Sequence, residues 1–147
     1  MAGTPGVRWF RAGAITLLVF AIVHGLAIYE ANFAEPRTDA ARAVKQAARA
    51  HQAQLGPFLA TAWGGMQILN TSYSILLCFV GLLDLVAVKD AAAPRVRTLA
   101  AVNMGLAAAL AGVALLYQFP PPAVFALAAL VCFTIAWRRT IRVSNPA

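Results

Sequence analysis

The chain has 147 residues, of which 61% are hydrophobic and 12% are charged, and its net charge is +7. A soluble domain carries about 25% charged residues, and a soluble chain of this length could not bury so much apolar surface in one core. Composition therefore excludes a water-soluble globular protein, and it assigns the basic charge to membrane topology and lipid headgroups, not to nucleic acid.

Four apolar runs have the composition of membrane-spanning helices. The first has Arg8 and Arg11 at its start and is longer than the apolar region of a signal peptide, so we expect a helix that is retained. The second has 31 residues, which requires tilting or a turn beyond the bilayer. The runs cover about residues 9–29, 58–88, 99–117 and 123–137.

The connections between the runs differ in character. The first, residues 30–57, is polar, and in it Thr38 can cap a short amphipathic helix over residues 39–55 that ends before Gly56. Its apolar stripe is mostly alanine, so we expect this helix to rest on the bundle or the membrane interface without inserting deeply. The third connection contains residues 120–122, three prolines that predict an extended turn.

The basic residues predict the orientation of the chain. Eight of the 12 lysines and arginines lie before or at the start of the first run, in the second connection or after the fourth run, and four lie in the first connection. The positive-inside rule therefore places both termini and the second connection in the cytoplasm. Trp9 and Trp137 then lie near the cytoplasmic interface, where indole rings are favoured.

Small residues recur at helical spacing in the third run, and we expect this face to pack against another helix. They are Gly105, Ala108, Ala109 and Gly112. The short second and third connections make the runs that they join neighbours. The sequence thus predicts an all-α fold with a single transmembrane domain over residues 1–147. This domain is an antiparallel four-helix transmembrane bundle with a short extra amphipathic helix between the first and second spans.

Polar groups inside a membrane are costly, so they are the first candidates for function. Gln67 and Asn70 share one face of the second span, Trp63 lies one turn before Gln67, and His24 lies at a similar depth in the first span. They predict a ligand pocket on the outer half of the bundle. Its expected ligand-binding residues are His24, Trp63, Gln67, Asn70, Tyr29, Glu30 and Tyr117. The alternative is that these polar side chains form hydrogen bonds between helices and only fix the bundle.

Redox, metal and haem chemistry is not indicated by the sequence. Cys78 and Cys132 do not form a C-x-x-C motif. His51, the only histidine besides His24, lies in the polar connection, so a haem held by two membrane histidines is not expected. We expect no catalytic residue, no metal and no cofactor.

A carboxylate, Asp84, lies near the inner end of the second span. We expect it to form a salt bridge with Arg95 or Arg97 across the second connection. The alternative is a role in proton coupling.

Three segments carry a resemblance to a known kind of protein: WFRAGAITLLVFAIVHGLAIYE, the polar segment ending in GPF, and YQFPPPAVFALAALVCF. With these segments and its order of spans, the chain resembles the small four-helix membrane proteins of bacteria that are DoxX-like in layout. The resemblance covers nearly the whole chain and implies a membrane location and a helical bundle, not a reaction. Ten arginines against two lysines fit a GC-rich bacterial genome, so we expect the bacterial inner (cytoplasmic) membrane.

Three functions remain open, and the sequence favours the first. In the first, the chain is an accessory subunit or a binder of a small lipophilic ligand. Its partners are then the bilayer, the ligand, and a membrane protein or a second copy of the chain. Alternatively, it is a membrane enzyme acting on a lipid or isoprenoid, with His24 as acid–base residue. Its partner would be Glu30, which lies six residues away and over one and a half helical turns from it. The third function is a small proton-coupled transporter that works as an oligomer through Glu30 or Asp84.

Overall fold

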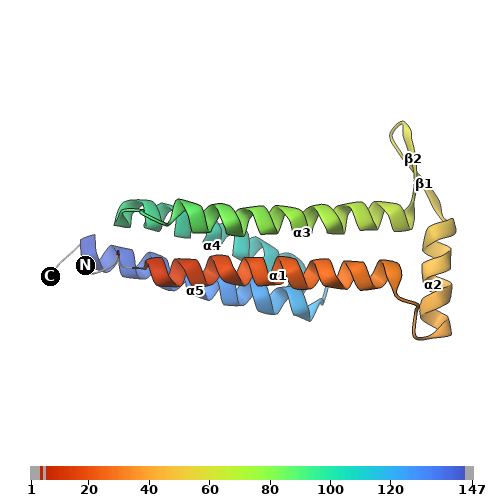
Figure 1. Ribbon diagram of the computed structural model, residues 1–147, viewed down its shortest axis with the longest axis horizontal. Coiled ribbons are helices and arrows are strands. Elements are labelled where there is room, and N and C mark those ends of the chain that lie inside the picture. The colour runs from red at the N-terminus through yellow and green to blue at the C-terminus, as the bar shows by residue number, and fades with distance from the viewer. Residues whose placement is uncertain (1–3, 5, 145–147) are drawn as a thin grey trace. The chain divides into compact units, whose positions relative to one another are not determined.

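The computed structural model describes residue 4 and residues 6–144 (Figure 1). The extreme ends, for which the charge pattern predicts a cytoplasmic location, lie outside the described residues. The described part is mainly helical, which confirms the predicted all-α class. Its elements are α1 (Val7–Phe33), α2 (Asp39–Ala50), β1 (Gln52–Leu55), β2 (Phe58–Thr61), α3 (Ala62–Ala87), α4 (Ala93–Leu116) and α5 (Pro120–Ser144).

Four of these helices, α1, α3, α4 and α5, are long and apolar enough to cross a membrane. Their candidate spans contain 27, 26, 24 and 22 residues, against the roughly 20 residues that match the hydrocarbon core. A continuous helix also pairs its own backbone groups, as hydrocarbon requires. The chain thus has the layout of a multi-pass membrane protein, in agreement with the expectation from composition.

The second apolar run is divided between two elements. Its first four residues form β2, which pairs antiparallel with β1 so that Leu55 lies opposite Phe58. Gly56, with φ of +61°, opens the two-residue turn between the strands, a conformation that glycine adopts at little cost. Helix α3 therefore begins only at Ala62, and α2 ends at Ala50, before the hairpin, instead of continuing to residue 55.

The three prolines of the third connection begin a helix, so the expectation of an extended turn was wrong. Helix α5 starts at Pro120. Prolines are tolerated in the first helical turn because the amides there have no helical acceptor, and the fixed φ of proline suits the helix. The change of direction falls instead on residues 117–119, where Gln118 has a φ of +52°.

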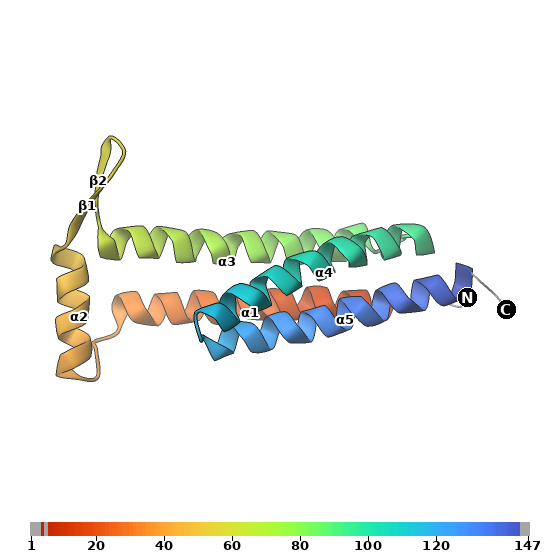
Figure 2. The ribbon, with the colours of Figure 1, turned by 180° about the vertical axis from the view of Figure 1, so that it is seen from behind.

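The chain divides into two compact units, and α1 and α3 each contribute to both. The first unit contains α1 up to Phe20 and the chain from Leu77 onward, and the second contains Ala21–Leu76. Helices α4 and α5 of the first unit lie side by side over their length (Figures 1 and 2).

The core of the first unit consists of alanines with a few large side chains between them. Phe10 and Phe133 are fully buried, and their ring centroids lie 5.2 Å apart in an edge-on arrangement. The buried alanines of α4 and α5 are Ala100, Ala107, Ala111, Ala114, Ala123, Ala126, Ala129 and Ala136. Small side chains let helix backbones approach closely where lipid supplies no hydrophobic drive.

The buried face of α4 is not the small-residue face expected from the sequence. Gly105, Ala108, Ala109 and Gly112 are exposed, and a Cβ added at either glycine would meet no atom within 4 Å. The close approach occurs on α3 instead. A Cβ added at Gly81 would lie 2.6 Å from Leu18 Cγ and 3.0 Å from the carbonyl oxygen of Ala14.

Candidate functional site

Helix α2 of the second unit starts with a side-chain cap, as its sequence predicts. Thr38 has extended backbone angles, and its hydroxyl oxygen accepts a hydrogen bond of 3.1 Å from the amide of Ala41. Asp39 in the first turn pairs with Arg42 at 2.7 Å. The cap satisfies one of the free amides at the helix start, and the acidic residue suits its positive end.

Lys45 connects α2 to the end of α1. Its ammonium group donates hydrogen bonds of 3.3 Å to the carbonyl oxygens of Asn32 and Ala34. The last carbonyls of a helix have no partner within the helix, and a cation there also suits the negative end of the helix dipole. Lys45 thus stabilises the point at which α1 ends and the chain turns toward α2.

Trp63, in the first turn of α3, lies beside two cations of α2. The Lys45 ammonium lies 5.5 Å from the centre of the indole ring, and the Arg49 guanidinium carbon lies 5.6 Å from it. Both distances are within the range of cation–π attraction. Since Lys45 and Arg49 are four residues apart, they project from one face of α2.

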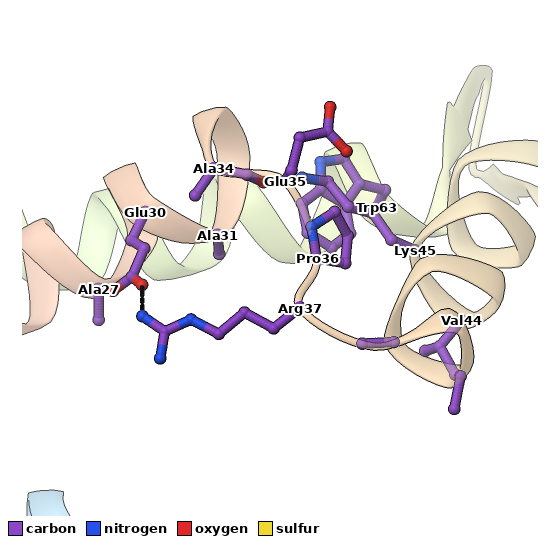
Figure 3. Close-up of a pocket in the computed structure, with 12 residues that line it drawn as sticks. Ala27, Glu30, Ala31, Ala34, Glu35, Pro36, Arg37, Val44, Lys45 and Trp63 are labelled. Atoms are coloured by element: carbon purple, nitrogen blue, oxygen red, sulfur yellow. Dashed lines mark hydrogen bonds and ion pairs between the residues drawn. The ribbon is translucent and has the colours of Figure 1, made fainter.

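These elements border an open pocket of about 640 Å³ at the end of α1, which we name the α1–α2 pocket (Figure 3). Its wall is mostly apolar, but it also carries two carboxylates and two cations, Glu30, Glu35, Arg37 and Lys45. Arg37 reaches back from the loop to Glu30, at 3.5 Å (Figure 3). The apolar part of the lining is Ala27, Ala31, Ala34, Pro36, Ala40, Ala41, Val44 and Trp63.

Two of the seven residues predicted to bind a ligand, Glu30 and Trp63, line this pocket. Tyr29 is exposed on α1, where its ring lies 4.8 Å from that of Phe33. Tyr117 belongs to the first unit, where it caps the end of α4.

The other three predicted residues lie on α1 and α3 within the second unit. The His24 ring lies 5.4 Å from the ring of Tyr73, nearly perpendicular to it. Gln67 Oε1 accepts a hydrogen bond of 2.9 Å from Asn32 Nδ2. The carbonyl oxygen of Asn70 accepts a bond from Ser74 in the same helix. The contacts of His24 and Gln67 join α1 to α3. Contacts between helices that only fix the bundle are the alternative to a ligand pocket that the sequence left open.

Three residues that shape the site were not among those predicted from the sequence: Asn32, Arg37 and Lys45. The cations of the first connection were used only to deduce topology. The i, i+4 spacing of Lys45 and Arg49, followed by an indole at the start of the next span, was the signal that could have identified Lys45. No such signal marked Asn32 or Arg37.

The first unit holds a buried polar pair between α3 and α4. Asn103 Nδ2 donates a hydrogen bond of 3.0 Å to Asp84 Oδ1, and the two residues are 4% and 7% exposed. Asp84 forms no ion pair with Arg95 or Arg97 within the described part of the chain, so the expected salt bridge is absent there. The guanidinium of Arg97 lies instead over the Trp137 ring.

Comparison of the chain with protein-family models, with curated proteins and with solved structures finds no match.

Proposed function

We propose that the chain is a non-enzymatic protein of the bacterial cytoplasmic membrane that binds a small lipophilic molecule in the α1–α2 pocket. In this proposal the four long helices form an antiparallel bundle, and both termini are cytoplasmic. Helix α2 then lies at the outer interface. The proposal also groups the chain with the small membrane proteins of DoxX-like layout, on the segments quoted from its sequence.

The orientation is supported by the first unit. The contact between Arg97 and Trp137, 5.9 Å from guanidinium carbon to ring centre, brings the start of α4 and the last turns of α5 to one end of this unit. Lys89, Arg95, Arg138 and Arg139 are near these residues in the sequence. A concentration of basic residues at one end of a helix pair is typical of the cytoplasmic side.

The observation that carries the binding function is the lining of the α1–α2 pocket. Its volume of about 640 Å³ falls within the 300–1,000 Å³ typical of small-molecule sites, which combine an apolar wall with a few fixed polar groups. The apolar wall suits a hydrocarbon group. The paired charges of Glu30 and Arg37, and the cation at Lys45, suit a polar end at the membrane surface.

The test is native mass spectrometry of the protein in mild detergent, with extraction and identification of any small molecule bound in stoichiometric amount. Ala31→Phe fills the pocket from an exposed position on α1 and is expected to remove the bound molecule. The matched control is Ala109→Phe on the exposed face of α4, which is expected to retain it. The proposal is refuted if the protein carries only bulk phospholipid, or if both variants retain the bound molecule equally. The remaining hypothesis is then that the chain is an accessory subunit of another membrane protein.

A second candidate, the small proton-coupled transporter, is favoured by Asp84. Its Oδ2 atom is buried and has no hydrogen-bond partner among the described residues. Carboxylates held in a membrane interior without full pairing are common in proton pathways. The test is the decay of an imposed pH gradient in vesicles that contain the protein. An unchanged decay in Asp84→Asn rejects this candidate.

A further inference from the structure

A second cavity lies in the first unit, apart from the residues that form the α1–α2 pocket. Its volume is about 450 Å³, and we name it the Arg97 cavity. Five of its lining residues come from the first turns of α4, and the sixth is an indole from α5. They are Ala93, Pro94, Arg97, Thr98, Ala101 and Trp137.

The guanidinium of Arg97 is available to a ligand. It lies over the Trp137 ring, and among the described residues it forms no hydrogen bond or ion pair. A guanidinium has five N–H donors in a planar fork, and this fork matches the oxygens of a phosphate group in pairs.

The charge around the cavity selects an anion. No carboxylate lines it, whereas the α1–α2 pocket contains Glu30 and Glu35. Exposed Arg138 and Arg139 directly follow Trp137 in the sequence. An anion at Arg97 would therefore experience a positive field from the surrounding chain.

The cavity also lies where one membrane-spanning helix begins and another ends. Its lining begins with the first residue of α4, and Trp137 lies one turn before the end of the α5 span at Ile141. Tryptophan and arginine at the ends of membrane helices lie at the headgroup level. The rest of the lining, Ala93, Pro94 and Ala101, is apolar and suits the glycerol and the first methylenes of a lipid chain.

We propose that the Arg97 cavity is a binding site for the phosphate headgroup of an anionic phospholipid. Basic pockets between membrane helices are known to hold such headgroups. The headgroup phosphate accepts hydrogen bonds from Arg97, and Trp137 forms the wall that faces the glycerol. This site uses none of the residues of the α1–α2 pocket and does not depend on what that pocket binds.

The experiment is native mass spectrometry of protein released from nanodiscs that contain equal amounts of phosphatidylglycerol and phosphatidylcholine. We expect one phosphatidylglycerol to be retained at a detergent concentration that removes phosphatidylcholine. Arg97→Gln is expected to lower this retention at least fivefold. Arg95→Gln removes an equal charge two residues away, from a side chain outside the cavity, and is expected to leave the retention unchanged.

A second variant, Ala101→Phe, fills the cavity from an exposed position without changing charge, and it is expected to displace the lipid as well. Equal losses in Arg95→Gln and Arg97→Gln would mean a general effect of charge and would overturn the proposal. So would equal retention of phosphatidylcholine. Displacement of the lipid by millimolar glycerol phosphate would assign the site to a soluble phosphate and would overturn the lipid assignment.

Discussion

Asn103 Nδ2 lies 3.0 Å from Asp84 Oδ1, and this hydrogen bond joins α4 to α3 inside the first unit. The same amide group also donates to the carbonyl oxygen of Leu99 at 3.1 Å. The second oxygen of Asp84 is buried without a hydrogen-bond partner among the described residues. The carboxyl group of Asp84 therefore depends on Asn103 for the only hydrogen bond that it forms in the described part of the chain.

Asn103→Ala is expected to lower the free energy of unfolding by about 1–3 kcal/mol, because it leaves a buried carboxyl group with no partner. The double variant with Asp84→Ala is expected to recover part of this loss, since both polar groups are then gone. The measurement is reversible unfolding in mixed detergent micelles. If the losses of the two single variants simply add in the double variant, the two side chains do not depend on one another.

Gly81→Ala is expected to destabilise the first unit by about 1–3 kcal/mol, the usual cost of overpacking. The added Cβ meets both the Leu18 side chain and a backbone oxygen of α1, and the backbone cannot move aside easily. Gly112→Ala is the matched control, because the added Cβ meets no atom within 4 Å. Thermal unfolding in detergent compares the two variants, and an equal change in both would contradict the close approach at Gly81.

Lys45→Met is expected to release α2 from the end of α1. It keeps the length of the side chain but removes two hydrogen bonds to helix carbonyls and one cation beside Trp63. Hydrogen exchange should become faster for the amides of α2 and for the last turn of α1. Arg42→Met is the control, since the ion pair of Arg42 joins it to Asp39 in the same helix. The role given to Lys45 fails if both variants exchange alike.

Thr38→Ala is expected to weaken α2 by about 1 kcal/mol through loss of its cap. Hydrogen exchange should become faster at the first amides of the helix. The largest effect is expected at Ala41, whose N–H donates a hydrogen bond to the Thr38 hydroxyl. Thr38→Asp preserves a capping oxygen and is expected to restore slow exchange. Persistence of slow exchange in the alanine variant would show that other contacts fix the start of α2.

The four spans could be predicted from the sequence because a run of about 20 apolar residues has few stable alternatives to a helix in lipid. The buried face of α4 could not be predicted from the sequence. This helix is apolar on every side and has small residues on two faces, so periodicity did not distinguish Ala107 and Ala111 from Gly105 and Gly112. The helices packed against α4, above all α5, decide which face is covered.

The candidate site was predictable in part for a similar reason. Glu30 and Trp63 stand at the ends of apolar runs, and the pocket forms where those runs end. The cations of the first connection have two possible roles, orientation of the chain and contact with a ring or a carbonyl. Their spacing is compatible with both, and only the fold brings Lys45 to the end of α1.

The connection between α4 and α5 has a consequence for how the chain enters its membrane. Three residues, Tyr117, Gln118 and Phe119, separate the helices, and none of them is charged. The amides of Tyr117 and Phe119 already bond to carbonyls of the last turn of α4, so little polar backbone would have to be transferred through hydrocarbon. During synthesis the two helices can therefore form a closed hairpin first and insert together, without a separate translocation step for the loop.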